Sequence, residues 1–178
     1  VKKIGGQRKG HHYYVIDLLP EGNGTYISNK ILKELGNHDI IVHCVGGALG
    51  VGNPLAYYFD WMKVWRFNVG IAIEINNVFV KSLIKKNWGR IVNVSSISAK
   101  DGDAKIAYAA AKSYLNSYTK NMSKMYSTKN IIFSGVMPGP LLTPGKFWFK
   151  QMKSNPKKVK KFIQQHYSIK RFGKANEI

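Results

Sequence analysis

The feature that most constrains the fold is a regular alternation of short apolar runs with longer stretches of helical periodicity. Runs rich in β-branched and aromatic residues favour strands, whereas apolar residues spaced three to four apart favour helices. Strands that alternate with helices form a parallel sheet through right-handed crossovers, and we expect helices on both faces. The predicted strands are residues 13–18, 39–45, 90–95 and 131–136. The predicted helices are residues 25–35, 58–86, 107–126, 147–152 and 157–166, with an interruption near 68–70 and a cap at Thr25.

The expected fold class is therefore α/β, with a doubly wound, Rossmann-like parallel sheet in a single domain that spans residues 1–178. Within this domain, residues 141–170 are expected to form a substrate-binding lid, because aromatic side chains gather there among many lysines. The chain has no initiator Met, and residues 175–178 resemble the start of a helix that does not continue. We therefore expect a partial sequence, truncated at both ends.

The charge is strongly positive, with 28 basic against nine acidic residues and a formal net charge of +19. Such a balance favours polyanions, yet only four of the basic residues are Arg, the side chain on which base and phosphate recognition most depends. The lysines are scattered over the chain and follow the water-facing sides of the predicted helices. This pattern favours a solvated surface over a nucleic-acid interface, although an anionic substrate or cofactor phosphate remains compatible with it.

The single cysteine, Cys44, excludes a disulfide framework and a zinc site with several thiolates, and it fits a reducing compartment. No uninterrupted apolar run approaches the roughly 20 residues of a membrane-spanning helix. The N-terminus has no apolar signal region. These observations predict a cytoplasmic protein without a membrane partner. Adjacent side chains on a strand point to opposite faces, so His43 and Cys44 indicate a buried strand rather than a metal site.

The strongest local signal is the pair Tyr108 and Lys112, separated by three alanines. Residues four apart share one face of a helix, so the phenol and the amine point into the same space. A nearby ammonium favours the phenolate form of a tyrosine and brings it toward the range useful for proton transfer. The alanines leave that helix face open to a flat ligand. In isolation the pair occurs often by chance, and its context decides its meaning.

That context consists of polar residues and glycines at the carboxyl ends of neighbouring strands, where ligands bind in doubly wound folds. A hydroxyl of Ser95 or Ser96 follows strand 90–95 and can bond the same substrate oxygen as the tyrosine. Gly46 and Gly47 end the preceding strand and let a ligand approach the backbone. Asn68 interrupts the long helix, either as a simple kink or as an amide that holds a proton-relaying water.

Together these residues resemble the short-chain dehydrogenases/reductases, in the branch with 3-oxoacyl-carrier-protein reductases and hydroxysteroid dehydrogenases. The resemblance runs from about residue 13 to residue 178. It implies a catalytic set of Tyr108, Lys112, Ser96 and Asn68, with Ser95 as the weaker choice of serine. It also implies a cofactor-binding set: Asp17, Val45, Gly46, Gly47, Tyr108, Lys112, Pro138, Gly139, Leu141 and Thr143.

Two departures from the family pattern matter. The family's Asn-Asn-Ala-Gly segment is replaced by residues 43–46, which keep the glycine but lose both amides. The N-terminal Thr-Gly-x-x-x-Gly-x-Gly turn, which holds the pyrophosphate at a helix N-terminus, is absent from the sequence. The determinant that separates NAD from NADP is missing or scrambled near residues 2–8. The resemblance therefore implies NAD or NADP without a choice between them, and no metal.

The activity implied by the resemblance is hydride transfer between a nicotinamide and a carbonyl or secondary alcohol, with the hard chemistry supplied by the cofactor. The implied partners are a small-molecule substrate, which can be carrier- or nucleotide-linked, and further copies of the chain in a homodimer or homotetramer formed through the long helices. Two other functions stay open. One is a nucleotide-sugar epimerase or dehydratase with the same Tyr/Lys pair, and the other is a non-catalytic basic binding protein.

Overall fold

A parallel sheet of three strands lies at the centre of the computed structural model, which describes residues 9–100, 104–145 and 147–178. The strands β1 (Ile40–His43), β2 (Gly89–Val94) and β3 (Ile131–Val136) neighbour one another in chain order. Ile41 pairs with Ile91, which in turn pairs with Phe133 on the far strand. Three of the predicted strands are thereby confirmed, as is the parallel sheet.

Helices connect the strands as the apolar periodicity predicts. The π-helix η2 interrupts the long helical stretch at the predicted place, and π-bulges of this kind are frequent at functional sites. The helices are α1 (Asn23–Leu35), α2 (Tyr58–Trp65), η2 (Arg66–Gly70), α3 (Ile71–Lys86), α4 (Ile106–Tyr126), α5 (Phe147–Ser154) and α6 (Pro156–His166), with short 3-10 turns η3 (Ile97–Ala99), η4 (Ser127–Lys129) and η5 (Ala175–Glu177).

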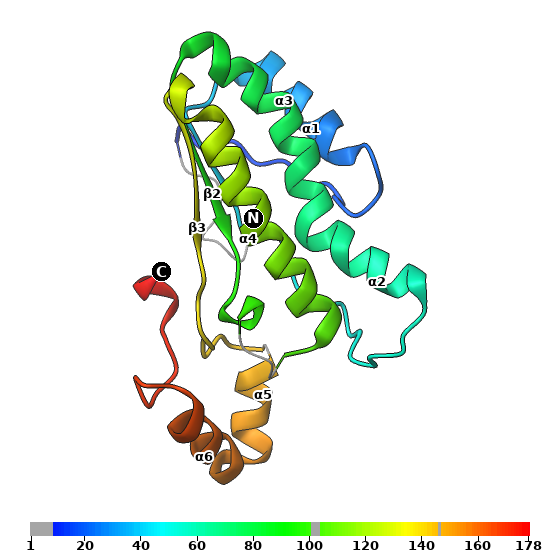
Figure 1. Ribbon diagram of the computed structural model, residues 1–178, viewed down its shortest axis with the longest axis vertical. Coiled ribbons are helices and arrows are strands. Elements are labelled where there is room, and N and C mark those ends of the chain that lie inside the picture. The colour runs from blue at the N-terminus through cyan, green and yellow to red at the C-terminus, as the bar shows by residue number, and fades with distance from the viewer. Residues whose placement is uncertain (1–8, 101–103, 146) are drawn as a thin grey trace.

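The helices α3 and α4 cover one face of the sheet, and α1 packs against α3 on the same side (Figure 1). The opposite face is open in the part of the chain that the structure describes, and Ile40 and Val42 expose 59% and 55% of their surface there. The expectation of helices on both faces is wrong for these residues. The physical reason is that both crossovers step across the sheet in the same direction, and right-handed crossovers of the same direction fall on one face.

Predicted strand 13–18 is also wrong, because this segment has no regular secondary structure and Val15 is 93% exposed. Rossmann sheets have the strand order 3-2-1-4-5-6. A strand at residues 13–18, before the helix that leads to β1, would be strand 3 of this general order, and strand 3 pairs with strand 2. The described residues contain no strand at that position, so the backbone of 13–18 has no strand to pair with. Residues 2–8, where the NAD/NADP determinant was expected, lie outside the described residues.

The first helix begins in a different way from the sequence prediction. Its first residue is Asn23 rather than a position after Thr25, and no side chain within the helix caps it. The carboxylate of Glu74, from α3, accepts hydrogen bonds from the backbone N–H groups of Gly22 and Gly24 at 2.9 Å each. It also pairs with Arg66 at 2.9 Å. A distant residue therefore satisfies the free donors that every helix N-terminus exposes.

The helical stretch Tyr58–Lys86 is long and apolar enough to cross a membrane by length and composition alone, with a window of mean hydropathy 1.3. Half of that window is buried inside the protein. Val64 and Val69 pack there against Ala107, Ala111 and Leu115 of α4. The apolar character of the stretch is thus accounted for by the core that it forms with α4.

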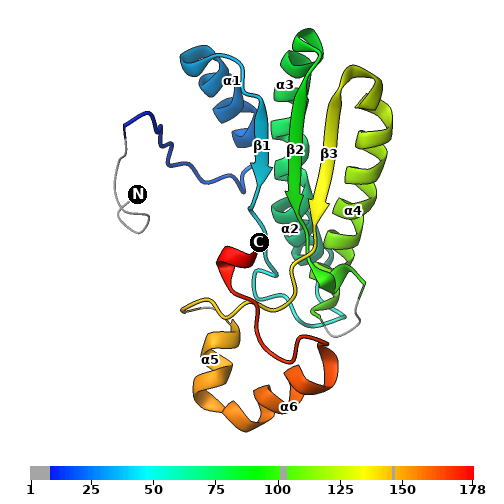
Figure 2. The same ribbon diagram turned by 90° about the vertical axis from the view of Figure 1, so that its left-hand side faces the viewer.

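Helices α5 and α6 lie beyond the carboxyl ends of the strands, below the arrowheads in Figure 2. Trp148 of α5 stacks on Phe162 of α6 with ring centroids 5.2 Å apart, and it also contacts Phe172. A single bridge between Leu141 and Gly173 ties the chain before α5 to the chain after α6. This aromatic packing joins the two helices to each other and to the segment that follows them.

Candidate active site

A cavity of about 510 Å³ opens between the carboxyl ends of the strands and the helices α5 and α6. Tyr108 and Ser96 both line it, so the structure brings the predicted acid and the predicted hydroxyl to one space. Carboxyl ends of parallel strands are where doubly wound folds bind ligands. The lining consists of Ala48, Leu49, Gly50, Ser96, Ile97, Ser98, Ala104, Lys105, Tyr108, Gly139, Pro140, Leu141, Phe147, Trp148, Phe162 and Tyr167.

Tyr108 and Lys112 lie one turn apart on α4, as the spacing predicts. The amine of Lys112 is 5.8 Å from the centroid of the Tyr108 ring. Lys112 is only 3% exposed, and its Nζ donates a 2.8 Å hydrogen bond to the backbone oxygen of Val94, the last residue of β2. The strand end therefore fixes the position of the amine behind the tyrosine.

Burial lowers the pKa of Lys112 from its ordinary value of 10.5 to about 8, and the neighbouring Cys44 acts in the opposite direction. Burial has this effect because the charged form loses its hydration. At neutral pH the amine remains mostly protonated, so a cation lies beside the Tyr108 ring.

This shift predicts the pH dependence of stability. The folded-state pKa lies below the unfolded value, so between about pH 8 and pH 10.5 the unfolded chain binds more protons and stability rises with pH. Below pH 8 the full cost of the buried charge is present, about 3 kcal/mol. Lys112→Met has no buried charge, so its free energy of unfolding lacks this pH dependence. The free energy of unfolding of Lys112→Met minus that of the wild type should therefore decrease by about 3 kcal/mol between about pH 8 and pH 10.5. Urea unfolding at several pH values measures it, and a pH-independent difference would contradict it.

The two candidate serines have different environments. Ser95 is 5% exposed, and its Oγ donates to the backbone oxygen of Lys112 at 3.3 Å. Ser96 is half-buried and faces the cavity, where its Oγ accepts a 3.1 Å hydrogen bond from the N–H of Ser98. Because Ser96 acts there as an acceptor, its own hydroxyl proton is available to a ligand. The geometry favours Ser96 over Ser95.

Asn68 lies in the π-helix η2 and is 2% exposed. Its Nδ2 donates 2.8 Å hydrogen bonds to the backbone oxygens of Gly47 and Val64, and its Oδ1 accepts one from the N–H of Gly47 at 3.0 Å. These bonds tie the loop after β1 to the helix. The structure therefore shows Asn68 as a positioning residue, and its part in a proton relay stays a prediction.

Gly46 shows how closely this loop approaches two of the predicted catalytic side chains. A Cβ placed on it would lie 2.6 Å from Oδ1 of Asn68 and 2.9 Å from Nζ of Lys112. A side chain at this position would displace one of these two groups, so glycine lets the exposed loop lie directly against the buried amine. This bare, exposed backbone fits the predicted cofactor. Val45, Gly46 and Gly47 are not among the residues that line the cavity, and their roles in binding the cofactor remain predictions.

The loop after β3 forms part of the cavity wall. Gly139 and Leu141 line the cavity, whereas Pro138 and Thr143 are not among its lining residues. The carbonyl of Pro138 accepts a 3.0 Å hydrogen bond from the N–H of Ile97, which joins the ends of β2 and β3. Roles for Pro138 and Thr143 in cofactor binding remain predictions.

Asp17, His43 and Cys44 are not among the residues that line this cavity. Asp17 is exposed, and its carboxylate accepts a 3.0 Å hydrogen bond from the N–H of Leu19. Its contact with an adenine edge stays a prediction. His43 is buried on β1 and its Nε2 lies 2.9 Å from Oδ1 of Asn76, whereas Cys44 is exposed. The two side chains thus face opposite ways, as expected of adjacent strand residues, but the expected burial is wrong for Cys44, which follows the last residue of β1.

Sequence reasoning missed Lys105, which lines the cavity three residues before Tyr108. Lys105 is the N-cap residue that precedes α4 and has non-helical backbone angles, so helical spacing does not place its side chain. Its sequence carries no motif that would have marked it. The loop at Leu49 was likewise not singled out, and it carries no motif.

The comparisons with known proteins show the family and the fold of this chain. The chain is 26% identical over 168 residues to the 3-oxoacyl-acyl-carrier-protein reductase FabG of Aquifex aeolicus, covering 94% of this chain and 65% of that protein. It is 32% identical over 143 residues to FabG of Rickettsia typhi, covering 78% and 57%. The chain therefore spans about two thirds or less of the length of these relatives.

Among solved structures, ElxO with NADP bound superposes with a TM-score of 0.80 at 25% identity, covering 92% of this chain and 65% of that one. A structure of NAD+-bound xylitol dehydrogenase gives the same TM-score at 24% identity and supports the Rossmann-like fold alone. The sequence profile of the short chain dehydrogenases matches residues 1–153. Because this match covers most of the chain and its site, the chain belongs to the short chain dehydrogenase family.

Proposed function

We propose that this chain carries the catalytic centre of an NAD(P)-dependent oxidoreductase that acts on a carbonyl or secondary alcohol. The observation that carries the proposal is the cavity where the phenol of Tyr108, backed by the buried amine of Lys112, meets the hydroxyl of Ser96. A bound nicotinamide supplies or accepts the hydride in this chemistry. The chain supplies the remaining groups.

In the reductive direction, Tyr108 donates its phenolic proton to the carbonyl oxygen, and Ser96 donates a hydrogen bond to the same oxygen. The ammonium of Lys112 stabilises the phenolate that remains. Gly46, Gly47, Lys112 and the loop 138–143 would hold the cofactor. In the oxidative direction the same groups act in reverse, with Tyr108 as the base.

We further propose that α5 and α6 form a lid within a single domain. Phe147, Trp148, Phe162 and Tyr167 line the cavity from these helices and the turn that follows them. Their aromatic surfaces offer an apolar wall opposite the catalytic groups. A lid of this kind shields a reaction from water.

The test is to mix the purified protein with NADH or NADPH and a panel of aldehydes and ketones. The proposal expects a carbonyl-dependent fall in the absorbance of the reduced nicotinamide. An epimerase or dehydratase would convert nucleotide sugars with no net change in cofactor. Salt-sensitive DNA binding without any response to cofactor would instead indicate the basic binding protein.

A second copy of the chain is the partner we propose, in a homodimer or homotetramer formed through the long helices. Aromatic side chains at the start of α2 support this, since Tyr58 and Phe59 are 69% and 81% exposed. We expect Phe59→Glu to lower the molecular mass measured by light scattering after gel filtration. Ile169→Glu, a matched change at another exposed apolar residue, should leave it unchanged. A monomeric wild type would refute this proposal.

We also propose a cytoplasmic location. Its support is the single cysteine, which lies exposed as a free thiol and suits a reducing compartment. Fractionation of cells that express a tagged protein tests it, and recovery from an exported fraction would contradict it.

A further inference from the structure

Lys105 brings a positive charge to the rim of the catalytic cavity. It is the residue that precedes α4, three positions before Tyr108, and it is exposed to solvent. Its Nζ donates a 3.1 Å hydrogen bond to the backbone oxygen of Gly50, another residue that lines the cavity. An ammonium has three N–H donors, so this bond holds the group in place and leaves donors for a ligand.

The cavity holds no counter-charge for this ammonium among the described residues. Lys105 is the one charged side chain in the lining, which is otherwise apolar, aromatic or hydroxyl-bearing. Most described acids are already paired elsewhere: Glu34 with Lys30, Asp39 with Lys86, Glu74 with Arg66 and Glu177 with Arg171. Asp101 and Asp103 precede Lys105 in the sequence and lie outside the described residues.

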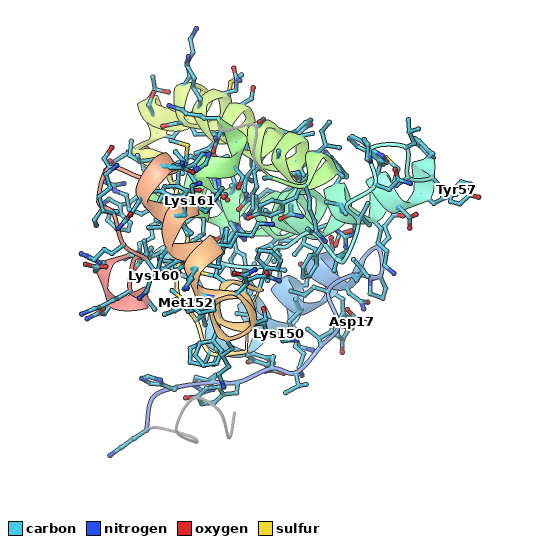
Figure 3. The ribbon with its side chains drawn as sticks, turned by 90° about the horizontal axis from the view of Figure 1, so that it is seen from below. Asp17, Tyr57, Lys150, Met152, Lys160 and Lys161 are labelled. Carbon is cyan, nitrogen blue, oxygen red and sulfur yellow. The ribbon has the colours of Figure 1, made fainter. Side chains whose placement is uncertain are left out.

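The electrostatic field around the cavity is also positive. Residues 147–170 contain seven lysines and no acidic residue. Figure 3 looks onto α5 and α6, where Lys150, Lys160 and Lys161 stand on the outside of the two helices. A surface of one sign around a cleft raises the local concentration of oppositely charged ligands. This field attracts anions to the cavity that Lys105 borders.

We propose that Lys105 binds an anionic group of the substrate, a carboxylate or a phosphate, while the substrate carbonyl lies at Tyr108 and Ser96. The proposal rests on the proposed function and narrows its substrate class to oxo acids or carbonyl compounds that carry a phosphate. The walls made by Leu49, Trp148 and Phe162 suit an apolar segment between the two groups.

Ligand binding tests this assignment without turnover. Trp148 lines the cavity, so its fluorescence reports occupancy, and the ligand-dependent signal should disappear in Trp148→Phe. The probes are levulinate against its neutral methyl ester, and dihydroxyacetone phosphate against dihydroxyacetone. We expect at least one anion to bind about tenfold more tightly than its neutral partner, which corresponds to about 1.4 kcal/mol. The pair that shows the difference identifies the carboxylate or the phosphate.

Lys105→Met should remove this preference while the affinity for the neutral compounds changes little. Lys120→Met, which removes the same charge from an exposed position on α4 away from the cavity, is the matched control and should retain the preference. Circular dichroism checks that both variants fold.

Three results would overturn the proposal: equal binding of each anion and its neutral partner, no saturable binding of any probe, or equal effects of the two variants. Absence of cofactor oxidation with every carbonyl compound would refute the proposed function instead, because the binding measurement needs no reaction.

Discussion

Tyr108→Phe is expected to lower turnover by about a hundredfold to ten-thousandfold, the usual contribution of a positioned proton donor. The change removes one oxygen from the wall of the cavity and leaves the ring where it packs beside Lys112. Cofactor affinity should remain close to that of the wild type, because the amine and the glycine-lined strand end are untouched. Steady-state kinetics and cofactor titration measure the two quantities separately.

Tyr114→Phe is the matched control, since Tyr114 lies on the same helix, is 49% exposed and is not among the residues that line the cavity. It should keep nearly full turnover. If Tyr108→Phe retained turnover, or if Tyr114→Phe lost as much, the assignment of Tyr108 as the proton donor would be wrong.

Asn68→Leu is expected to destabilise the protein by about 2 to 4 kcal/mol. The leucine keeps the volume of the side chain but removes three hydrogen bonds, two to Gly47 and one to Val64. The loop that carries Gly46 then loses its attachment beside Lys112, and we expect a fall in turnover of about a hundredfold from the misplaced loop. Urea unfolding and steady-state kinetics measure the two effects.

Asn76→Leu separates the two effects. Asn76 is also fully buried on this helical stretch, where it hydrogen-bonds His43 at 2.9 Å and Tyr118 at 3.0 Å. It does not line the cavity, so its replacement should lower stability by a similar amount and leave the turnover of the folded fraction nearly unchanged. Equal losses of turnover in both variants would show that Asn68 acts through stability alone.

The elements that the sequence predicts well depend on local periodicity. Strand β3 has the predicted bounds, and the long helix breaks where Asn68 and Gly70 interrupt its pattern. The pairing of Tyr108 with Lys112 is equally local, because four residues make about one helical turn whatever surrounds the helix.

Other features depend on contacts between distant parts of the chain. Residues 13–18 have the composition of a strand, yet a strand forms only where a neighbour accepts its hydrogen bonds. The first helix is capped by Glu74, about fifty positions away, through a carboxylate that no local pattern assigns to that N-terminus. The close approach of Gly46 to Asn68 and Lys112 likewise joins three separate elements.

By itself, the sequence determined the alternation of strands and helices and the placement of Tyr108 and Lys112 on one helix face, since both follow from geometry within a few residues. The tertiary structure decided which serine faces the cavity. Ser95 and Ser96 are adjacent after β2 and point in different directions, and only the packing of α4 and of the loop after β3 shows on which side the cavity lies. Burial of Lys112 was decided in the same way, because the surface around one side chain is contributed by residues that meet only when the chain folds.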